Sequence, residues 1–337
     1  MLNKIKTIKE SKMKQKLIFL LTILGISLIL TISGCSKGSK TNHQKEKQTK
    51  VERFVDDIRT SIKCDKNFSY SKKIESYDFT LEEYIEVQNK LSEGLDDKFF
   101  NKQIDFKKSS DERTNYFIVY SMKTHFITKW YKTLPKEEIV YEKVLPIVKN
   151  SNDMLRYLWL GEMDHLLMDI HNKKLPFNEE NKNKTMDELI SIFTNKENRI
   201  EIKIRAFEAW PFCETREDKI YEVFNILLND DEELFMLIGR EFSFLRIKAP
   251  RLFDLMFNIL DNRQNYSDEI ILGALSFFEN SGIYGENEGD LGIERRIKLK
   301  ILSQEIIESD QNKEIIEKAE EILEIFEYME KKGNINE

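Results

Sequence analysis

IEIKIRAF at residues 200–207, FMLIGREF at residues 235–242 and IILGALSF at residues 270–277 begin 35 residues apart and share apolar positions. The segment after the first of these stretches contains FNIL at residues 224–227, and the segment after the second contains FNIL again at residues 257–260. Apolar positions that recur at this period are typical of stacked helical hairpins, because one hairpin alone cannot bury its apolar face. The alternative is a chance alignment between helices rich in Leu, Ile and Phe.

The helix–turn–helix period resembles that of HEAT-type repeats over roughly residues 186–333. This resemblance implies an α-solenoid, although the motif residues that separate HEAT from tetratricopeptide and other helical arrays are absent. Gly and Pro are scarce, at 12 and 5 of 337 residues, and apolar residues recur at steps of three and four. We therefore expect an all-α body: a helical-hairpin array in the C-terminal half and an irregular helical N-terminal half.

Local signals predict where several helices begin. Thr80 with Glu83, and Thr185 with Glu188, both match the capping box, in which a hydroxyl and a carboxylate satisfy free amides at a helix start. Pro250 suits a first helical position. The apolar residues of a first helix share one face: Val51, Phe54, Val55, Ile58 and Ile62.

The N-terminus carries a basic start at residues 12–16, an apolar run at residues 17–32 and the small-residue ending ISGC at residues 32–35. This order is typical of a secretory signal. The ending resembles the lipobox of bacterial lipoproteins, which implies cleavage before Cys35 and fatty acylation of its thiol. The alternative is a membrane-spanning anchor, for which the apolar run is short, since a span needs about 20 residues.

The lipoprotein resemblance implies a location in the bacterial cell envelope, outside the cytoplasm, with the lipid on Cys35 held in a membrane. The resemblance makes residues 1–34 a signal peptide. The polar composition after Cys35 predicts a flexible tether (35–50), and apolar periodicity divides the rest into an N-terminal helical region (51–175) and the repeat region (186–333). Residues 1–34 contain six lysines and one glutamate, so their removal takes the net charge from −7 to −12. An acidic body repels phosphate, so we expect no nucleic-acid partner.

One set of side chains has the spacing of metal ligands. On a helix, Glu162, His165 and Asp169 lie on one side, as in the Glu-x-x-His ligands of di-iron bundles. Such sites need a second matching copy, and the chain contains no other Glu-x-x-His. A polar helix flank is the alternative, and we expect neither a metal nor another cofactor.

Three further features are open to two interpretations each. The loop at residues 280–292 holds four of the twelve glycines, but it fails the EF-hand pattern, so we expect a flexible insertion that carries binding contacts. Cys64 and Cys213 either form a disulfide or remain free thiols. Aromatic residues of one predicted helix either line a ligand groove or form a core: Tyr116, Phe117, Tyr120, Phe126, Trp130 and Tyr131.

No phosphate loop, dinucleotide fingerprint, zinc-binding cysteine pairs or nucleophile elbow occurs in the sequence, so nothing in it argues for an enzyme. The leading hypothesis is a membrane-anchored envelope lipoprotein that acts as a non-enzymatic protein-binding scaffold. An alternative is a ligand- or lipid-binding module, or an uncharacterised enzyme, with an aromatic-lined pocket. A further alternative is an immunity or inhibitor lipoprotein.

Overall fold

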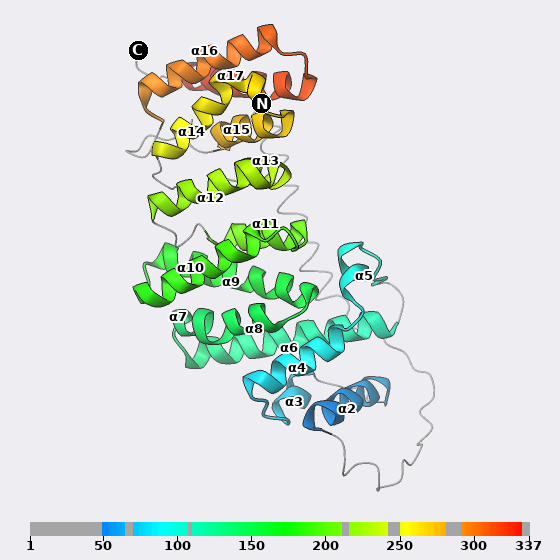
Figure 1. Ribbon diagram of the computed structural model, residues 1–337. Helices are drawn as coiled ribbons and strands as arrows, with labels where there is room; N and C mark the ends of the chain where they lie inside the picture. Colours follow the sequence, from blue (N-terminus) through cyan, green and yellow to red (C-terminus); the bar gives the residue numbers. More distant parts are fainter. Residues whose placement is uncertain are drawn as a thin grey trace.

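The computed structural model describes residues 49–64, 70–106, 110–210, 216–241, 250–280 and 291–331. Within these ranges the chain is helical and contains no β-strand, so the predicted all-α class is confirmed (Figure 1). The predicted lipobox with Cys35, most of the tether, Cys213 and most of the loop at residues 280–292 lie outside the described residues. Cys64 ends the first helix, and its side chain is also outside them.

The helices of the first half are α2 (Lys50–Cys64), α3 (Tyr70–Glu75), α4 (Leu81–Ser92), α5 (Asp96–Phe100), α6 (Asp111–Thr133), α7 (Lys136–Glu138), the π-helical turn η3 (Ile139–Val144), α8 (Leu145–Asn150) and α9 (Asp153–Lys173). Those of the second half are α10 (Glu179–Thr194), α11 (Ile200–Ala209), α12 (Glu217–Asp230), α13 (Glu232–Glu241), α14 (Pro250–Asp261), the 3₁₀ turn η6 (Arg263–Asn265), α15 (Asp268–Asn280), α16 (Gly292–Ser309) and α17 (Lys313–Lys331).

Two of the predicted helix starts are confirmed. The Thr80 hydroxyl accepts a hydrogen bond from the Glu83 amide at 3.2 Å, and the Glu83 carboxylate accepts one from the Thr80 amide at 3.0 Å. Helix α14 begins at Pro250. The predicted apolar face of α2 is buried at each position whose side chain is described: Val51, Phe54, Val55 and Ile58.

The predicted capping box at Thr185 is wrong. Helix α10 begins at Glu179, where the Asn178 side chain accepts hydrogen bonds from two first-turn amides. Thr185 lies inside this helix, fully buried, and its hydroxyl donates to the Asn181 carbonyl at 2.8 Å. The Glu188 carboxylate pairs with Lys149 instead of closing a box. A matching local pattern therefore did not mark a helix end here.

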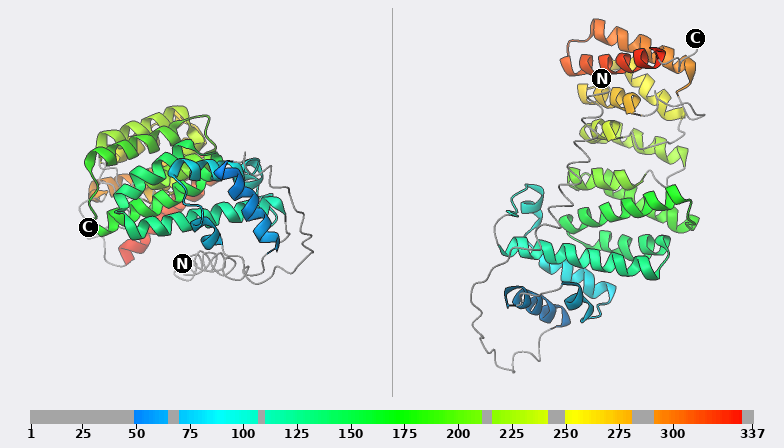
Figure 2. Two further views of the ribbon diagram at one scale, coloured as in Figure 1. Left: turned by 90° about the horizontal axis from the view of Figure 1, so that it is seen from below. Right: turned by 180° about the vertical axis from the view of Figure 1, so that it is seen from behind.

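Consecutive helices of the second half pack in pairs: α10 with α11, α12 with α13, α14 with α15, and α16 with α17. Contacts also run between alternate helices, so that α9, α11, α13, α15 and α17 follow one another in one row, and α10, α12, α14 and α16 in a second. Figures 1 and 2 show these layers along one axis, with α2 near one end of the molecule and α16 and α17 at the other.

The closest approach within the first row is between α13 and α15, where two glycines face each other. A Cβ atom added to Gly239 would overlap the carbonyl oxygen of Gly273. One added to Gly273 would lie 2.8 Å from the Phe235 ring. The backbones of these helices are therefore in contact, which only residues without a side chain permit at this point.

Polar contacts between helix starts repeat along one edge of the first row. Ser267, just before α15, donates to the Glu232 carboxylate at the start of α13, at 2.7 Å. Asn312, just before α17, donates to the Asp268 carboxylate at the start of α15, at 2.6 Å. Each carboxylate also lies in the first turn of its helix, where the helix dipole favours negative charge. These contacts fix the offset between successive helices.

The first half continues the same packing with less regular helices. Helix α4 contacts α2, α6 and α9, and α9 in turn packs against α11 of the second half. The π-helical turn η3 joins α7 to α8 and ends at Val144, two residues before Pro146. Pro146 cannot donate a hydrogen bond and its ring would crowd a carbonyl one turn earlier, and a wider turn accommodates both effects.

None of the helices in the described ranges combines the length and the hydrophobicity needed to cross a bilayer. The apolar run at residues 17–32 lies outside those ranges.

Candidate functional site

Glu162, one of the three residues with metal-ligand spacing, lies on the side of α9 that faces α6, where it forms a desolvated ion pair. Its carboxylate lies 2.7 Å from the ammonium of Lys123, and the two side chains are only 12% and 11% exposed. The Lys123 ammonium also lies 5.4 Å from the centre of the Tyr120 ring and 6.0 Å from that of Trp159. Glu162 is therefore engaged in holding α9 against α6.

The two other residues with this spacing, His165 and Asp169, have different surroundings. The Asp169 carboxylate accepts hydrogen bonds from Lys136 and Lys173, and these bonds lower its pKa below the ordinary value. His165 has a side chain that is 66% exposed, and its Nδ1 atom lies 3.9 Å from Asp164. In the part of the chain that the structure describes, no three His, Cys, Asp or Glu side chains gather closely enough to hold a metal ion.

Asp164 belongs to a charged contact between α9 and α11. Burial raises its pKa to about 6, an effect that nearby His165 and Arg205 oppose and Glu208 adds to. The Arg205 guanidinium bonds to Glu208 at 2.6 Å and lies over the Tyr157 ring at 5.0 Å. These side chains pack on one another and connect the two helices.

Part of the aromatic set at residues 116–131 forms a filled core. Phe126 and Trp130 are buried between α4, α6 and α9, where they pack with Tyr84 and Trp159 at ring-centre distances of 4.1–6.4 Å. The Trp159 indole donates to the buried side chain of Gln88 at 2.9 Å, so its polar atom is satisfied. Of the two interpretations, groove and core, Phe126 and Trp130 thus fit the core.

A second set of rings, which we name the aromatic surface, lies on α5, α6 and α9 and on the connection between α5 and α6. Four of its rings are partly buried against the core: Phe99, Phe100, Tyr116 and Tyr157. Its rings form a chain of edge-to-face and stacked contacts with centres 5.1–6.2 Å apart, and all of them are at least partly exposed: Phe99, Phe100, Phe106, Tyr116, Phe117, Tyr120 and Tyr157. Phe106 is 42% exposed. Burial among its neighbours raises the pKa of Tyr116 to about 12, so this residue is a neutral phenol at physiological pH.

Arginines border the aromatic surface. The Arg199 guanidinium lies 5.0 Å from the centre of the Phe100 ring, and Arg205 lies over Tyr157. Arg199 also pairs with Asp97 and Asp153. Partly exposed aromatic rings next to arginine are the composition that protein–protein interfaces favour over the rest of a protein surface. This surface is the candidate functional site.

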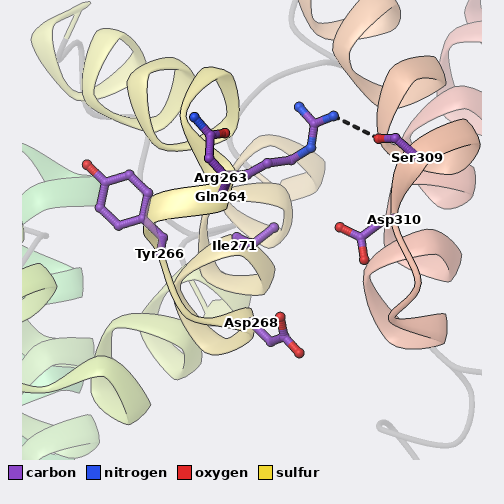
Figure 3. A pocket seen from close by; sticks show the side chains of 7 residues that line it. All are labelled: Arg263, Gln264, Tyr266, Asp268, Ile271, Ser309 and Asp310. Carbon is purple, nitrogen blue, oxygen red and sulfur yellow. Dashed lines mark hydrogen bonds between the residues drawn. The ribbon is translucent and has the colours of Figure 1, made fainter.

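An open polar hollow of about 400 Å³ lies near the opposite end of the molecule, beside the turns before α15 and α17 (Figure 3). Arg263 reaches across it to the Ser309 hydroxyl, at 2.9 Å. Its acidic residues, Asp268 and Asp310, both accept hydrogen bonds from Asn312. The polar groups of the hollow are thus used in joining two helix pairs, and we assign no ligand to it.

No protein-family model matches the chain, and no curated protein or solved structure is similar to it. The function therefore has to be inferred from the chemistry of the surfaces.

Several of these surface residues were not found from the sequence. The aromatic surface combines residues that lie up to about 60 positions apart, such as Phe99 and Tyr157, and only folding brings them together. The predicted set at residues 116–131 included Tyr116, Phe117 and Tyr120. The adjacent pair Phe99–Phe100, in a short and otherwise charged segment, was the available signal for the rest.

Proposed function

We propose that this chain is a lipid-anchored protein of the bacterial cell envelope, and that its helical body is a non-enzymatic scaffold that binds another protein. The anchor is the acylated thiol of Cys35, and residues 36–49 link it to α2. The anchoring part rests on the order of basic, apolar and small residues that ends at Cys35.

We infer further that residues 179–331 form a HEAT-like α-solenoid. The support is the pairing of consecutive helices together with the two rows of alternate helices. The segments spaced 35 residues apart in the sequence fall in α11, α13 and α15, which are successive helices of one row. Solenoids expose long surfaces, because each unit contacts only its neighbours, and proteins use such surfaces to bind partners.

The observation that carries the binding role is the aromatic surface. Its rings are held in place by one another, so little side-chain entropy is lost when a partner covers them. The alternative of an aromatic-lined pocket has less support, because Phe126 and Trp130 are packed in the core.

Two measurements on cells that express the full chain test this proposal. Cys35→Ser should move the protein out of the membrane fraction, and a variant that stays there would contradict lipid anchoring. A photo-reactive phenylalanine at Phe106 or Phe117 should cross-link to one defined protein, whereas the same group at Leu175, a similarly exposed apolar side chain on another surface, should not. Equal labelling at all three positions, or none, would contradict the scaffold role.

A further inference from the structure

Helix α16 has a row of exposed isoleucines. Ile293, Ile297 and Ile301 recur every four residues and are 51%, 56% and 50% exposed. The buried face of the same helix carries its own apolar residues: Leu299, Leu302 and Ile306. Three large aliphatic side chains aligned on one exposed face mark an interaction site more often than isolated ones do.

This face lies at an end of the array. Helix α14 contacts α12, and α16 contacts α14 in the same way, so each helix of this row covers the one before it. Within the described ranges no helix follows α16 in the row, and Figures 1 and 2 show it at the end of the molecule remote from α2. A terminal unit of a solenoid needs a polar outer face to stay soluble on its own. The three exposed isoleucines instead make part of the outer face of α16 apolar.

The contact between α14 and α16 shows which side chains bind to the outer face of a helix in this row. Arg295 of α16 bonds to Asp254 of α14 at 2.7 Å, with its guanidinium 5.8 Å from the centre of the neighbouring Phe253 ring. One turn later, Lys298 bonds to Asp261 at 2.6 Å and lies 4.9 Å from the centre of the Phe257 ring. In both contacts, a cationic side chain of α16 thus binds a carboxylate and an aromatic ring of α14.

The same contact occurs one step earlier in the row. Arg251 of α14 pairs with Asp218 of α12 and lies 4.3 Å from the centre of the Tyr221 ring. Cations at the start of each new helix therefore meet apolar and acidic side chains of the helix before it.

The outer face of α16 has the same combination. Ile293 is followed by Glu294, as Phe253 is followed by Asp254, and both helices have another large apolar residue four positions after the first, Ile297 in α16 and Phe257 in α14. Three exposed glutamates lie on or beside the isoleucine row and have no ion pair within the described part of the chain: Glu294, Glu305 and Glu308.

We propose that the outer face of α16, formed by Ile293, Ile297, Ile301 and the three glutamates, is a docking surface for a basic amphipathic helix of a partner protein. In the proposed complex the partner helix packs on α16 as α16 packs on α14, and so adds one more helix to the row. This inference rests on the proposed scaffold function and names a surface for it. An anionic lipid surface would repel these glutamates.

Peptide binding to the full chain in phosphatidylcholine nanodiscs tests the docking surface. The probe is a fluorescent helical peptide of about the length of α16, with leucines every four residues flanked by lysines, and the control peptide has glutamates in place of the lysines. We expect fluorescence anisotropy to show binding of the lysine peptide alone, after subtraction of its binding to empty nanodiscs. Equal binding of both peptides, or of neither, would overturn the proposal.

The variants identify the surface that binds. Ile293→Ser, Ile297→Ser and Ile301→Ser together should weaken binding of the lysine peptide about tenfold or more. Leu175→Ser, at another exposed apolar side chain, should leave it unchanged. The melting temperature of the triple variant should match that of the unsubstituted chain, because the isoleucines are half exposed. Unchanged peptide binding by the triple variant would exclude this face.

Other occupants give different results. A concentration-dependent dimer in sedimentation that the triple variant loses would assign the face to a second copy and overturn the proposal. Capture by phosphatidylglycerol vesicles that the triple variant loses would assign it to lipid, with the same consequence. If the triple variant fails to bind the peptide but still forms the cross-link from Phe117, the scaffold function and the docking surface are both supported as separate sites. If the unsubstituted chain does not bind the lysine peptide selectively but still forms the cross-link from Phe117, the proposed docking surface is rejected and the scaffold function is retained.

Discussion

At the scale of single residues, Gly239 and Gly273 determine how closely α13 and α15 pack. We expect Gly239→Ala to lower the free energy of unfolding by about 1–3 kcal/mol, because the new methyl group overlaps backbone that cannot move freely. Gly161→Ala is the matched control, since its Cβ atom would lie 3.5 Å from Arg205, an ordinary contact. Urea unfolding followed by circular dichroism measures both, and equal losses would contradict the close approach.

Asp164 makes stability depend on pH. Its pKa is raised from 3.8 to about 6, so between these values the folded chain binds more protons than the unfolded chain. Stability therefore falls as the pH rises through this window. Asp164→Asn removes the effect, and we expect the variant to be more stable by on the order of 2 kcal/mol at pH 7, with no gain below about pH 4. A gain of equal size at both pH values would rule out burial of the charge as its cause.

At the scale of elements, the start of α10 shows what a local pattern can decide. Thr80 and Thr185 are followed by the same capping-box spacing, yet only Thr80 caps a helix. Asn178 is an equally good cap, with two glutamates directly after it, and burial of Thr185 against the core selects the longer helix. The choice depends on tertiary packing, which no local pattern contains.

Hydrogen exchange tests this helix start. With the helix start at Glu179, the first amide with a helical partner is that of Lys182, which donates to the Asn178 carbonyl at 2.8 Å, so we expect slow exchange from about Lys182 onward. Asn178→Ala should remove about 1 kcal/mol of stability and speed exchange in the first turn. Fast exchange through residues 183–188 would instead place the start at Thr185.

Helix α16 shows a second limit of predicting structure from the sequence of one helix. Apolar residues occur on both of its faces, so periodicity alone does not tell which face is buried. Only the position of α16 at the end of a row identifies Ile293, Ile297 and Ile301 as the exposed set. The sequence thus contained the residues of this surface without indicating their exposure.

At the scale of the whole molecule, the scarcity of Gly and Pro and the apolar steps of three and four predicted the helical class, and the segments that recur every 35 residues lie largely in α11, α13 and α15. Periodicity could not indicate more than this. It could not predict the aromatic surface, which unites Phe99, Tyr116 and Tyr157 from three helices. It also could not show that Glu162 pairs with Lys123, because that contact spans 39 positions. Chemistry that depends on neighbours distant in sequence follows from the packing of the helices.

We propose that Cys35 anchors the helical body to a membrane while the aromatic surface and α16 bind other proteins. Intact mass spectrometry of the protein from native membranes tests it most directly. We expect a chain that begins at Cys35 and carries a diacylglycerol on its thiol. A chain that still begins at Met1 or Met13, without any acyl group and recovered from the soluble fraction, would contradict the claim.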